Sequence, residues 1–422
     1  MRRETGGPLM LSSITLLNGE RSDVYLSGGL INAIMPSGSA YPNGSQYKKM
    51  ELSGYLLLPA PVEAHAHLDR ALLVDRATNP GGDLIEAIAA IRAIFPSLSA
   101  ADIRERALQA VTEGVAKGFT ALRTHSGCGP TLGLRSVEVL VELRENLRDF
   151  MDLQVVAMTE NGLTGADGRA TRDTLAAAMA LGADLVGGSP SMEEDSRAAV
   201  RELLAIAREA GCGVDLHVDE TVDPEILALK YLAEEVVRSG FDLPVTASHC
   251  VSLGMQNPTV AREISAAVAD AKIAVIALPQ TNLFLQGRST RTLKPRGLTA
   301  LAELLEAGVQ VAAGGDNWRD PFNPMGRIDP FETASLLVSA GHLSPETAYA
   351  CVSNRARSIM GIREIEIEPG GAADLLAVRA SSLTDAVAGG SEERLVIRAG
   401  RILAQSTIKR EWDSGLLEAI NH

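Results

Sequence analysis

The fold is decided by the stretch Pro59-Ala60-Pro61-Val62-Glu63-Ala64-His65-Ala66-His67-Leu68-Asp69-Arg70, which follows the apolar run 55–58. Side chains two residues apart on a β-strand point to the same face. A strand that ends in His65-Ala66-His67 therefore presents two imidazole rings side by side. Because imidazole is a good ligand for zinc and iron, the pair indicates a metal site at a strand end. Asp69 and Arg70 come next, and a salt link between them that supports the loop is the simplest interpretation.

Helical and strand-like segments alternate after His67, down to about residue 360. Ser99, with Asp102 three positions later, predicts a capping box at a helix start, and Gly118 predicts the end of that helix. Counting from Leu57, about eight strands fit this alternation. The later ones are residues 120–125, 153–158, 183–187, 213–217, 245–249, 273–278 and 309–313. This order predicts a (β/α)₈ TIM-like barrel. The alternative is a doubly wound open sheet, although no Gly-x-Gly-x-x-Gly turn follows the first strand.

Both ends of the chain consist of short strand-like runs between turn residues. Neither end is large enough to bury a core by itself. We therefore predict one small β-sandwich built from residues 1–58 and 365–422, beside a catalytic barrel of residues 59–364. Near the end of the barrel segment we expect a helix from Pro345 to about Met360, with proline at its first position. The run 395–402 is predicted as a strand.

The composition places limits on partners and location. Of 422 residues, 46% are hydrophobic and 22% are charged, which is typical of a soluble globular protein. The net charge of −14 without a Lys/Arg cluster argues against nucleic-acid and membrane partners. Four widely spaced cysteines and the absence of a signal-peptide pattern favour the cytoplasm. A homo-oligomer is compatible with such a barrel, although no sequence feature sets a number of subunits.

Five of the seven histidines fall at predicted strand ends, namely His65, His67, His125, His217 and His249. In a barrel of this kind, residues at the carboxyl ends of the strands point into the active site. Asp316 follows the last predicted strand. Three imidazoles and a carboxylate form a divalent-metal site, and a metal lowers the pKa of bound water from about 15.7 to roughly 7. Glu220, three residues after His217, is close enough to handle protons beside the metal.

Several segments resemble the amidohydrolase superfamily, specifically its cytosine deaminase-like branch. They are residues 61–69, His217-Val218-Asp219-Glu220, Ser248-His249-Cys250, 285–288, 294–297, Gly314-Gly315-Asp316-Asn317 and 320–326. The resemblance extends in order from about residue 55 to 380. It implies one divalent ion, zinc or iron, per subunit, bound by His65, His67, His217 and Asp316. It also implies that Glu220 moves a proton to a ring nitrogen, that Asp316 takes a proton from the water, and that His249 orients the attacking hydroxide.

The implied reaction is hydrolytic deamination of a small nitrogen heterocycle, with release of ammonia. A pyrimidine such as cytosine or isocytosine, a triazine and a pterin are all candidates. Glu160 stands where cytosine deaminases carry a glutamine, and an ionised carboxylate only accepts hydrogen bonds. Glu160 therefore favours a substrate edge with N–H donors or positive charge. Asn317 replaces a second acid of the family, so cytosine itself is in doubt. We predict these two residues, with Gln154, His125 and Trp318, as substrate contacts.

Three of these contacts have competing interpretations from the sequence. The face of the strand to which Gln154 points is undetermined. Trp318 could wall the pocket or pack in the core, and His125 could line the pocket or donate to a carboxylate.

Two other functions fit the same residues. A related hydrolase could remove a substituted amine from a triazine-like ring or open a cyclic amide, and neither reaction releases ammonia. A non-catalytic barrel that serves as an assembly subunit would have lost metal ligands, and none is lost here.

Overall fold

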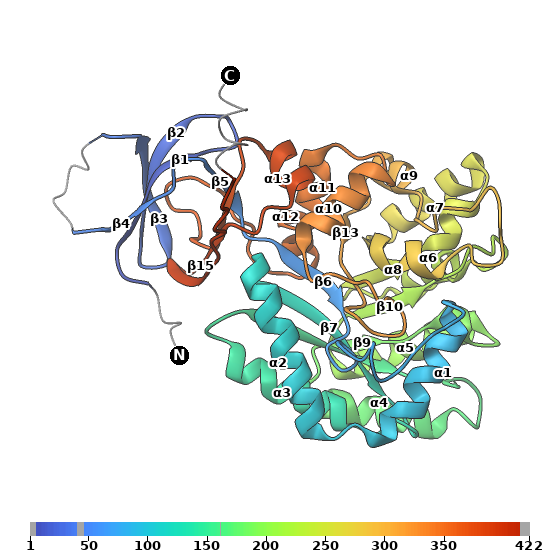
Figure 1. Ribbon diagram of the computed structural model, residues 1–422. Helices are drawn as coiled ribbons and strands as arrows, with labels where there is room; N and C mark the ends of the chain where they lie inside the picture. The colour runs from blue at the N-terminus through green and yellow to red at the C-terminus, as the bar shows by residue number, and fades with distance from the viewer. Residues whose placement is uncertain (1–5, 40–45, 161, 414–422) are drawn as a thin grey trace.

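The computed structural model describes residues 6–39, 46–160 and 162–413. Figure 1 shows two units, a barrel surrounded by helices and a smaller β-rich unit beside it. Strands from both coloured ends of the chain, blue and red, meet in the smaller unit. The two predicted units are thus present. The exact domain boundaries proposed from the sequence stay a prediction, and their outermost residues lie outside the described ranges.

The larger unit contains eight parallel strands that pair with their sequence neighbours. They are β6 (Val62–Ala66), β7 (Ala121–Cys128), β8 (Asp152–Thr159), β9 (Leu185–Gly187), β10 (Val214–Val218), β11 (Val245–His249), β12 (Ala274–Ala277) and β13 (Val311–Ala313). A parallel bridge between Ala66 and Asp316 connects the first strand to the segment after the last, and Asp316 N donates to His65 O at 2.9 Å. The predicted (β/α)₈ barrel is confirmed, and its closure brings Asp316 beside the histidine pair.

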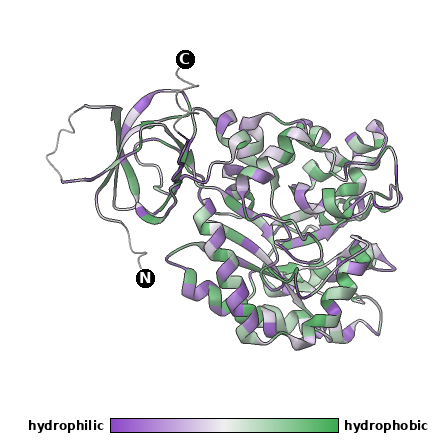
Figure 2. Ribbon diagram, viewed as in Figure 1, coloured by the Kyte–Doolittle hydropathy of each residue, from purple (hydrophilic) through white to green (hydrophobic). Residues whose placement is uncertain are grey.

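Helices cover the outside of this barrel. They are α1 (Leu84–Ile94), α2 (Ala100–Lys117), α3 (Arg135–Leu147), α4 (Arg169–Ala180), α5 (Ser196–Ala210), α6 (Ala228–Ser239), α7 (Pro258–Asp270), α8 (Pro279–Leu285), α9 (Leu301–Glu306), α10 (Pro330–Ser339), α11 (Pro345–Cys351) and α12 (Asn354–Ile359). As predicted, Ser99 caps α2 by accepting from Asp102 N, and Gly118 ends it with a φ of 117°. These helices carry both hydrophobic and hydrophilic residues (Figure 2), as amphipathic surface helices do. Within the described ranges, no helix is long and apolar enough to cross a bilayer.

The smaller unit joins strands from both ends of the chain, as predicted. They are β1 (Leu9–Thr15), β2 (Arg21–Ser27), β3 (Leu30–Pro36), β4 (Lys48–Glu51), β5 (Tyr55–Pro59), β14 (Leu375–Arg379), β15 (Arg394–Arg398) and β16 (Arg401–Gln405). The order is β16-β15-β14-β5-β1-β2-β3, with β4 also on β1. A separate apolar core combines Leu11 and Val24 with Leu375 and Ile397. Because this core draws on both ends, neither end forms the unit alone. The short helix α13 (Leu383–Gly389) lies between β14 and β15 in the sequence.

The sequence-based account is wrong about the first barrel strand. The strand that contains Leu57 is β5, which pairs with β14 in the smaller unit. The chain leaves that sheet at Ala60 and Pro61, and the barrel strand begins only at Val62. Proline cannot donate to a strand ladder, so Pro61 marks the crossing between the two sheets.

Two further segments are each divided in two. The expected helix from Pro345 to Met360 breaks between α11 and α12, and Val352 O at the break accepts from Val62 N at 2.8 Å. The break therefore gives the start of the first barrel strand a backbone partner. The run 395–402 forms the hairpin β15–β16, because Ala399 and Gly400 adopt φ values of 47° and 74°. Two successive positive φ values produce the tight turn that reverses a strand.

Candidate active site

The nitrogen and oxygen atoms of four side chains converge at the carboxyl end of the barrel. His67 Nε2 lies 3.2 Å from His217 Nε2 and 3.2 Å from Asp316 Oδ1. His65 Nε2 lies 3.6 Å from the same Asp316 oxygen. Four ligands placed about 2.1 Å from a tetrahedral metal are separated by roughly 3.4 Å from one another. These spacings match the ligand shell of one divalent ion.

Strand ends place these side chains. His65 lies in β6 and His67 directly after it, His217 lies in β10, and Asp316 follows β13. The backbone here is unusual, because Asp316 has a φ of 64° and His249 a φ of 73°. Positive φ is costly for residues with side chains and is often found at functional sites. The backbone at Asp316 and His249 is therefore locally strained where it directs their side chains into the site.

A chain of buried hydrogen bonds supports the first histidine. His65 Nδ1 lies 2.9 Å from Ser248 Oγ, and the Ser248 hydroxyl donates to Asp215 Oδ1 at 2.8 Å. Arg123 NH1 donates to the other Asp215 oxygen at 2.7 Å. Because the single hydroxyl proton of Ser248 goes to Asp215, Ser248 accepts the proton on His65 Nδ1. This tautomer leaves the lone pair of His65 Nε2 available as a ligand.

Burial sets the protonation of the cluster. Loss of solvation is the main cause that holds the pKa of each of His65, His67 and His217 well below its ordinary value. The other histidines of the cluster lower these pKa values further, and Arg70 does so for His67 and His217. The three imidazoles are therefore neutral near pH 7, which is the form that binds metals. Burial raises the pKa of Asp316 to about 8, and the nearby Arg70 guanidinium opposes that rise. A bound cation would favour the ionised carboxylate.

Glu220 and His249 form the other wall of the cluster. His249 Nδ1 lies 3.2 Å from Asn282 Oδ1 and 3.6 Å from Glu220 Oε1, and its Nε2 lies 4.0 Å from Asp316 Oδ2. Burial lowers the pKa of His249 to about 3. Burial and the Asp316 carboxylate raise the pKa of Glu220 well above its ordinary value, and Arg70 opposes this shift. Glu220 therefore holds its proton more tightly than an exposed glutamate does.

Unpaired polar atoms gather at the same place. Buried atoms without a hydrogen-bond partner include His65 Nε2, His249 Nε2, Asp316 Oδ2, Asn282 Nδ2 and Asn317 Oδ1. Burying such groups without partners costs free energy, so a concentration of them indicates a place for a ligand. The donor set of neutral imidazoles and one carboxylate fits a divalent ion such as zinc or iron.

His125 joins the cluster in a different way. Its ring stacks on His65 with centroids 3.9 Å apart and an interplanar angle of 28°. Ligand atoms of His65, His125 and His217 lie within 4.8 Å of one another, as do those of His65, His249 and Asp316. The lone pairs of two stacked rings lie in nearly parallel planes, so His65 and His125 do not point at one ion. His125 Nε2 is also 3.7 Å from Asp215 Oδ1, too far for a hydrogen bond.

Two predicted substrate contacts are wrong. Gln154 lies near the amino end of β8, whereas the histidines lie at the carboxyl end of the barrel. Its Nε2 donates to Met360 O at 2.8 Å, and its Oε1 accepts from Arg123. Trp318 is only 1% exposed and stacks on Phe119 in the main hydrophobic core. Both side chains are therefore structural.

Asn317 and Glu160 lie at the site, but each already has a partner. Asn317 Nδ2 donates to Asp316 Oδ1 at 2.7 Å. Glu160 Oε1 accepts from the backbone N–H groups of Thr131 and Leu132 at 3.0 and 2.6 Å. Asn317 thus holds the Asp316 carboxylate, and Glu160 holds a neighbouring loop while facing a small cavity.

The cavity beside the cluster has a volume of about 100 Å³. Arg70, Met158, Glu160 and Phe322 are among the residues that line it. Sequence reasoning missed Arg70 as a site residue, although a cation directly after the His-x-His-x-Asp stretch was visible. It also missed Ser248 and Asp215 as supports of His65, because only the pairing of β10 with β11 brings them together.

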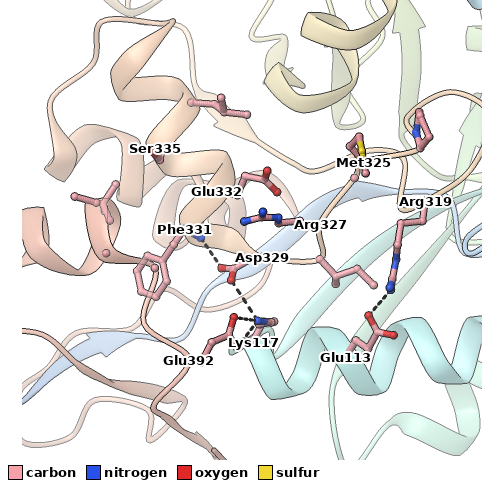
Figure 3. A pocket seen from close by; sticks show the side chains of 18 residues that line it. Glu113, Lys117, Arg319, Met325, Arg327, Asp329, Phe331, Glu332, Ser335 and Glu392 are labelled. Atoms are coloured by element: carbon pink, nitrogen blue, oxygen red, sulfur yellow. Dashed lines mark hydrogen bonds and ion pairs between the residues drawn. The ribbon is translucent and has the colours of Figure 1, made fainter. Parts of the chain in front are cut away.

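A larger groove of about 700 Å³ lies elsewhere, lined by residues of α2 and α10. None of the converging histidines lines it. Figure 3 shows ion pairs between charged side chains that line this groove. Lys117 pairs with Glu392 and lies 3.7 Å from Asp329, and Arg319 pairs with Glu113. We therefore locate the chemistry at the histidine cluster rather than at this groove.

Comparison with known proteins identifies the family of this chain. The model of the Amidohydrolase family matches residues 49–404. A pterin deaminase from Rhizobium rhizogenes is 35% identical over 391 residues, which cover 92% of this chain and 88% of that protein.

Solved structures give the same result. A 5-methylcytosine deaminase from Klebsiella pneumoniae, liganded with 5-fluorocytosine, superposes with a TM-score of 0.87 at 26% identity and covers 96% of this chain and 100% of that one. An N-isopropylammelide isopropylaminohydrolase from Burkholderia multivorans has a TM-score of 0.80 at 28% identity, with coverage of 95% and 99%. The resemblance to the cytosine deaminase-like branch is thus confirmed. The chain belongs to the amidohydrolase family and is a hydrolytic enzyme that acts on C–N bonds.

Proposed function

We propose that this protein is a metal-dependent deaminase that hydrolyses the amino group of a pterin-like ring. The observation that carries the proposal is that His67 Nε2 lies 3.2 Å from both His217 Nε2 and Asp316 Oδ1, and that His65 Nε2 lies 3.6 Å from the same oxygen. Glu220 and His249 lie beside these groups. In this reaction the bond between the ring carbon and its exocyclic nitrogen breaks. Water supplies the oxygen of the new oxo group, and ammonia leaves.

One divalent ion, zinc or iron, would be held by His65, His67, His217 and Asp316. When bound, such an ion supplies Lewis acidity that makes a water molecule nucleophilic near neutral pH. The orphaned, buried Nε2 of His65 supports this assignment, because it lacks a hydrogen-bond partner in the described structure.

The neighbouring residues handle protons and orientation. Glu220, whose pKa is raised by burial and by the Asp316 carboxylate, donates a proton to the ring nitrogen beside the carbon under attack. Asp316 accepts a proton from the attacking water through Oδ2, the oxygen without a partner. His249, held by Asn282 Oδ1, orients that water through Nε2. The proton gained by Asp316 then goes to the departing amine, and the proton of the new hydroxyl group returns to Glu220 as the C–N bond breaks, which balances the reaction.

The choice of a pterin-like ring rests on the relative that is a pterin deaminase and on Glu160. A pterin has a 2-amino-4-oxo edge with N–H donors, which a carboxylate can accept. Removal of a substituted amine is the second candidate, because one structural neighbour is an N-isopropylammelide isopropylaminohydrolase. Cytoplasmic location, self-association and the absence of nucleic-acid partners stay predictions.

A substrate panel tests the proposal. Ammonia release would be measured on protein of known metal content with pterin, isocytosine, cytosine and N-isopropylammelide. We expect pterin to be turned over fastest, with one ammonia per ring. Release of isopropylamine from N-isopropylammelide, with pterin inert, would replace the proposal by the second candidate. No turnover of any ring by protein with one bound metal would reject both.

A further inference from the structure

Arg70 lies between the histidine cluster and the small cavity. One guanidinium nitrogen contacts both ring nitrogens of His67, with His67 Nε2 at 3.0 Å, and lies 3.9 Å from Met158 Sδ. The guanidinium carbon lies 4.5 Å above the centre of the Phe322 ring. The same side chain lines the cavity together with Glu160. Arg70 is thus the side chain that joins the metal centre to the space beside it.

The predicted salt link between Asp69 and Arg70 is wrong. Asp69 Oδ2 accepts from Gly127 N at 2.9 Å, and the Asp69 carbonyl accepts from Arg106. Among the described residues, no carboxylate oxygen lies within 4.0 Å of an Arg70 nitrogen. Arg70 Nε is also buried without a hydrogen-bond partner.

The burial of Arg70 donors without hydrogen-bond partners costs free energy unless a ligand supplies the acceptors. A partly buried guanidinium loses hydration, and unpaired donors do not recover that loss. The Phe322 ring packs against one face of the guanidinium, and one terminal nitrogen contacts His67. The N–H groups of the other terminal nitrogen are left to meet a planar group. Arg70 therefore places a planar donor that is always charged beside the cavity where a planar substrate would lie.

We propose that Arg70 is a substrate-binding residue that donates hydrogen bonds to the ring oxo group conjugated with the amidine under attack. This inference rests on the proposed function and adds the substrate class, namely rings in which an oxo group accompanies the amino group. The hydrogen bonds orient the amino-bearing carbon toward the metal centre and Glu220.

The chemistry of the reaction explains why a cation is useful there. Addition of an oxygen nucleophile to the amino-bearing carbon pushes electron density into the ring, toward the conjugated oxo oxygen. A fixed guanidinium stabilises this developing negative charge more than it stabilises the neutral ring. Arg70 should therefore contribute to kcat as well as to KM.

The test compares Arg70→Met with Arg76→Met. Arg76 belongs to the same segment but pairs with Asp102 near the surface, where its side chain is 42% exposed. Each metal-loaded protein would be assayed with isocytosine, which carries the oxo group, and with 2-aminopyrimidine, which lacks it. Pterin and 2-aminopteridine form a second pair.

We expect Arg70→Met to lower kcat/KM for the oxo-bearing ring by roughly 10- to 100-fold. The same variant should change kcat/KM for the ring without the oxo group by less than about 3-fold. Arg76→Met should resemble the unaltered protein on both rings. Guanidinium chloride at millimolar concentration should partly restore an Arg70→Ala variant, and metal content should stay the same in all variants.

Two outcomes would overturn the assignment of Arg70. One is equal behaviour of Arg70→Met and Arg76→Met on the oxo-bearing ring. The other is an equal loss by Arg70→Met on both rings of a pair, which would indicate a structural role. If the unaltered, metal-loaded protein deaminates no ring at all, the proposed function has failed, and the Arg70 variants are not needed to show it.

Discussion

The ring nitrogen Nδ1 of His65 lies 2.9 Å from the hydroxyl oxygen of Ser248, and both side chains are completely buried. Ser248 in turn donates to Asp215, which Arg123 pairs from the other side. A serine thus connects a carboxylate to a histidine of the proposed metal site. Such outer partners fix the tautomer and orientation of a ligand and influence how tightly the metal binds.

Replacement of Ser248 by alanine should weaken metal binding by roughly 10- to 100-fold, because His65 loses the acceptor for its Nδ1 proton. Competition with a fluorescent zinc chelator measures this change. Ser265→Ala is the matched control, because the Ser265 hydroxyl is buried without a partner. Equal zinc affinities for the two variants would show that Ser248 does not support the site.

Glu220→Gln should lower kcat by roughly 100- to 10,000-fold, because the amide cannot deliver a proton to the ring nitrogen. The metal content should not change, since Glu220 stands beside the proposed ligands. Steady-state kinetics and metal analysis on the same sample measure both effects. Glu225→Gln, at an exposed position five residues further along the chain, serves as the control. Retention of full turnover by Glu220→Gln would remove Glu220 from the mechanism.

Glu160→Gln should shift the substrate preference toward cytosine, by about 10-fold in the ratio of kcat/KM values for cytosine and pterin. The glutamine oxygen can still accept from Thr131 N and Leu132 N, so the loop should stay in place. Glu193→Gln is a suitable comparison, because Glu193 likewise accepts from backbone N–H groups of a nearby loop. An unchanged ratio would show that Glu160 has only this loop-holding role.

Arg394→Met should destabilise the contact between the two units. Arg394 is buried in β15 and donates to both carboxylate oxygens of Asp329, at 2.7 and 3.1 Å. Loss of one partner from a buried pair costs about 3–5 kcal/mol in the free energy of unfolding. Arg379→Met, at a side chain that is 52% exposed on the neighbouring strand, should cost less than about 1 kcal/mol. Urea unfolding at constant metal content measures the difference, and coinciding midpoints would refute it.

The main features of the fold could be predicted from sequence because local patterns repeat along the chain. The His-x-His pair, the capping box at Ser99 and the strand endings at His217 and His249 each depend only on neighbouring residues. The first barrel strand was misplaced because β5 and β6 are separated only by Ala60 and Pro61, and apolar content does not show which sheet a strand joins.

The site was harder to predict wherever two distant segments had to be aligned. The place of Gln154 could not be predicted, because the sequence leaves open the face to which it points. Two residues from the start of β8, its side chain lies at the amino end of the barrel, away from the histidines. The role of Ser248 could be predicted only from the register of β10 against β11, which pairs Ser248 with His217. The orientation of Arg70 depends on its contact with Phe322, which lies more than two hundred residues away in the chain and could not be placed from sequence.

The most direct test of the account is a titration of metal-depleted protein with zinc or ferrous iron, with ammonia release from pterin as the measured quantity. A single ion held by His65, His67, His217 and Asp316 predicts that the rate rises linearly and levels off at one equivalent per chain. His217→Asn should abolish this response. Ammonia release that does not depend on added metal, or no release with one equivalent bound, would contradict the central claim.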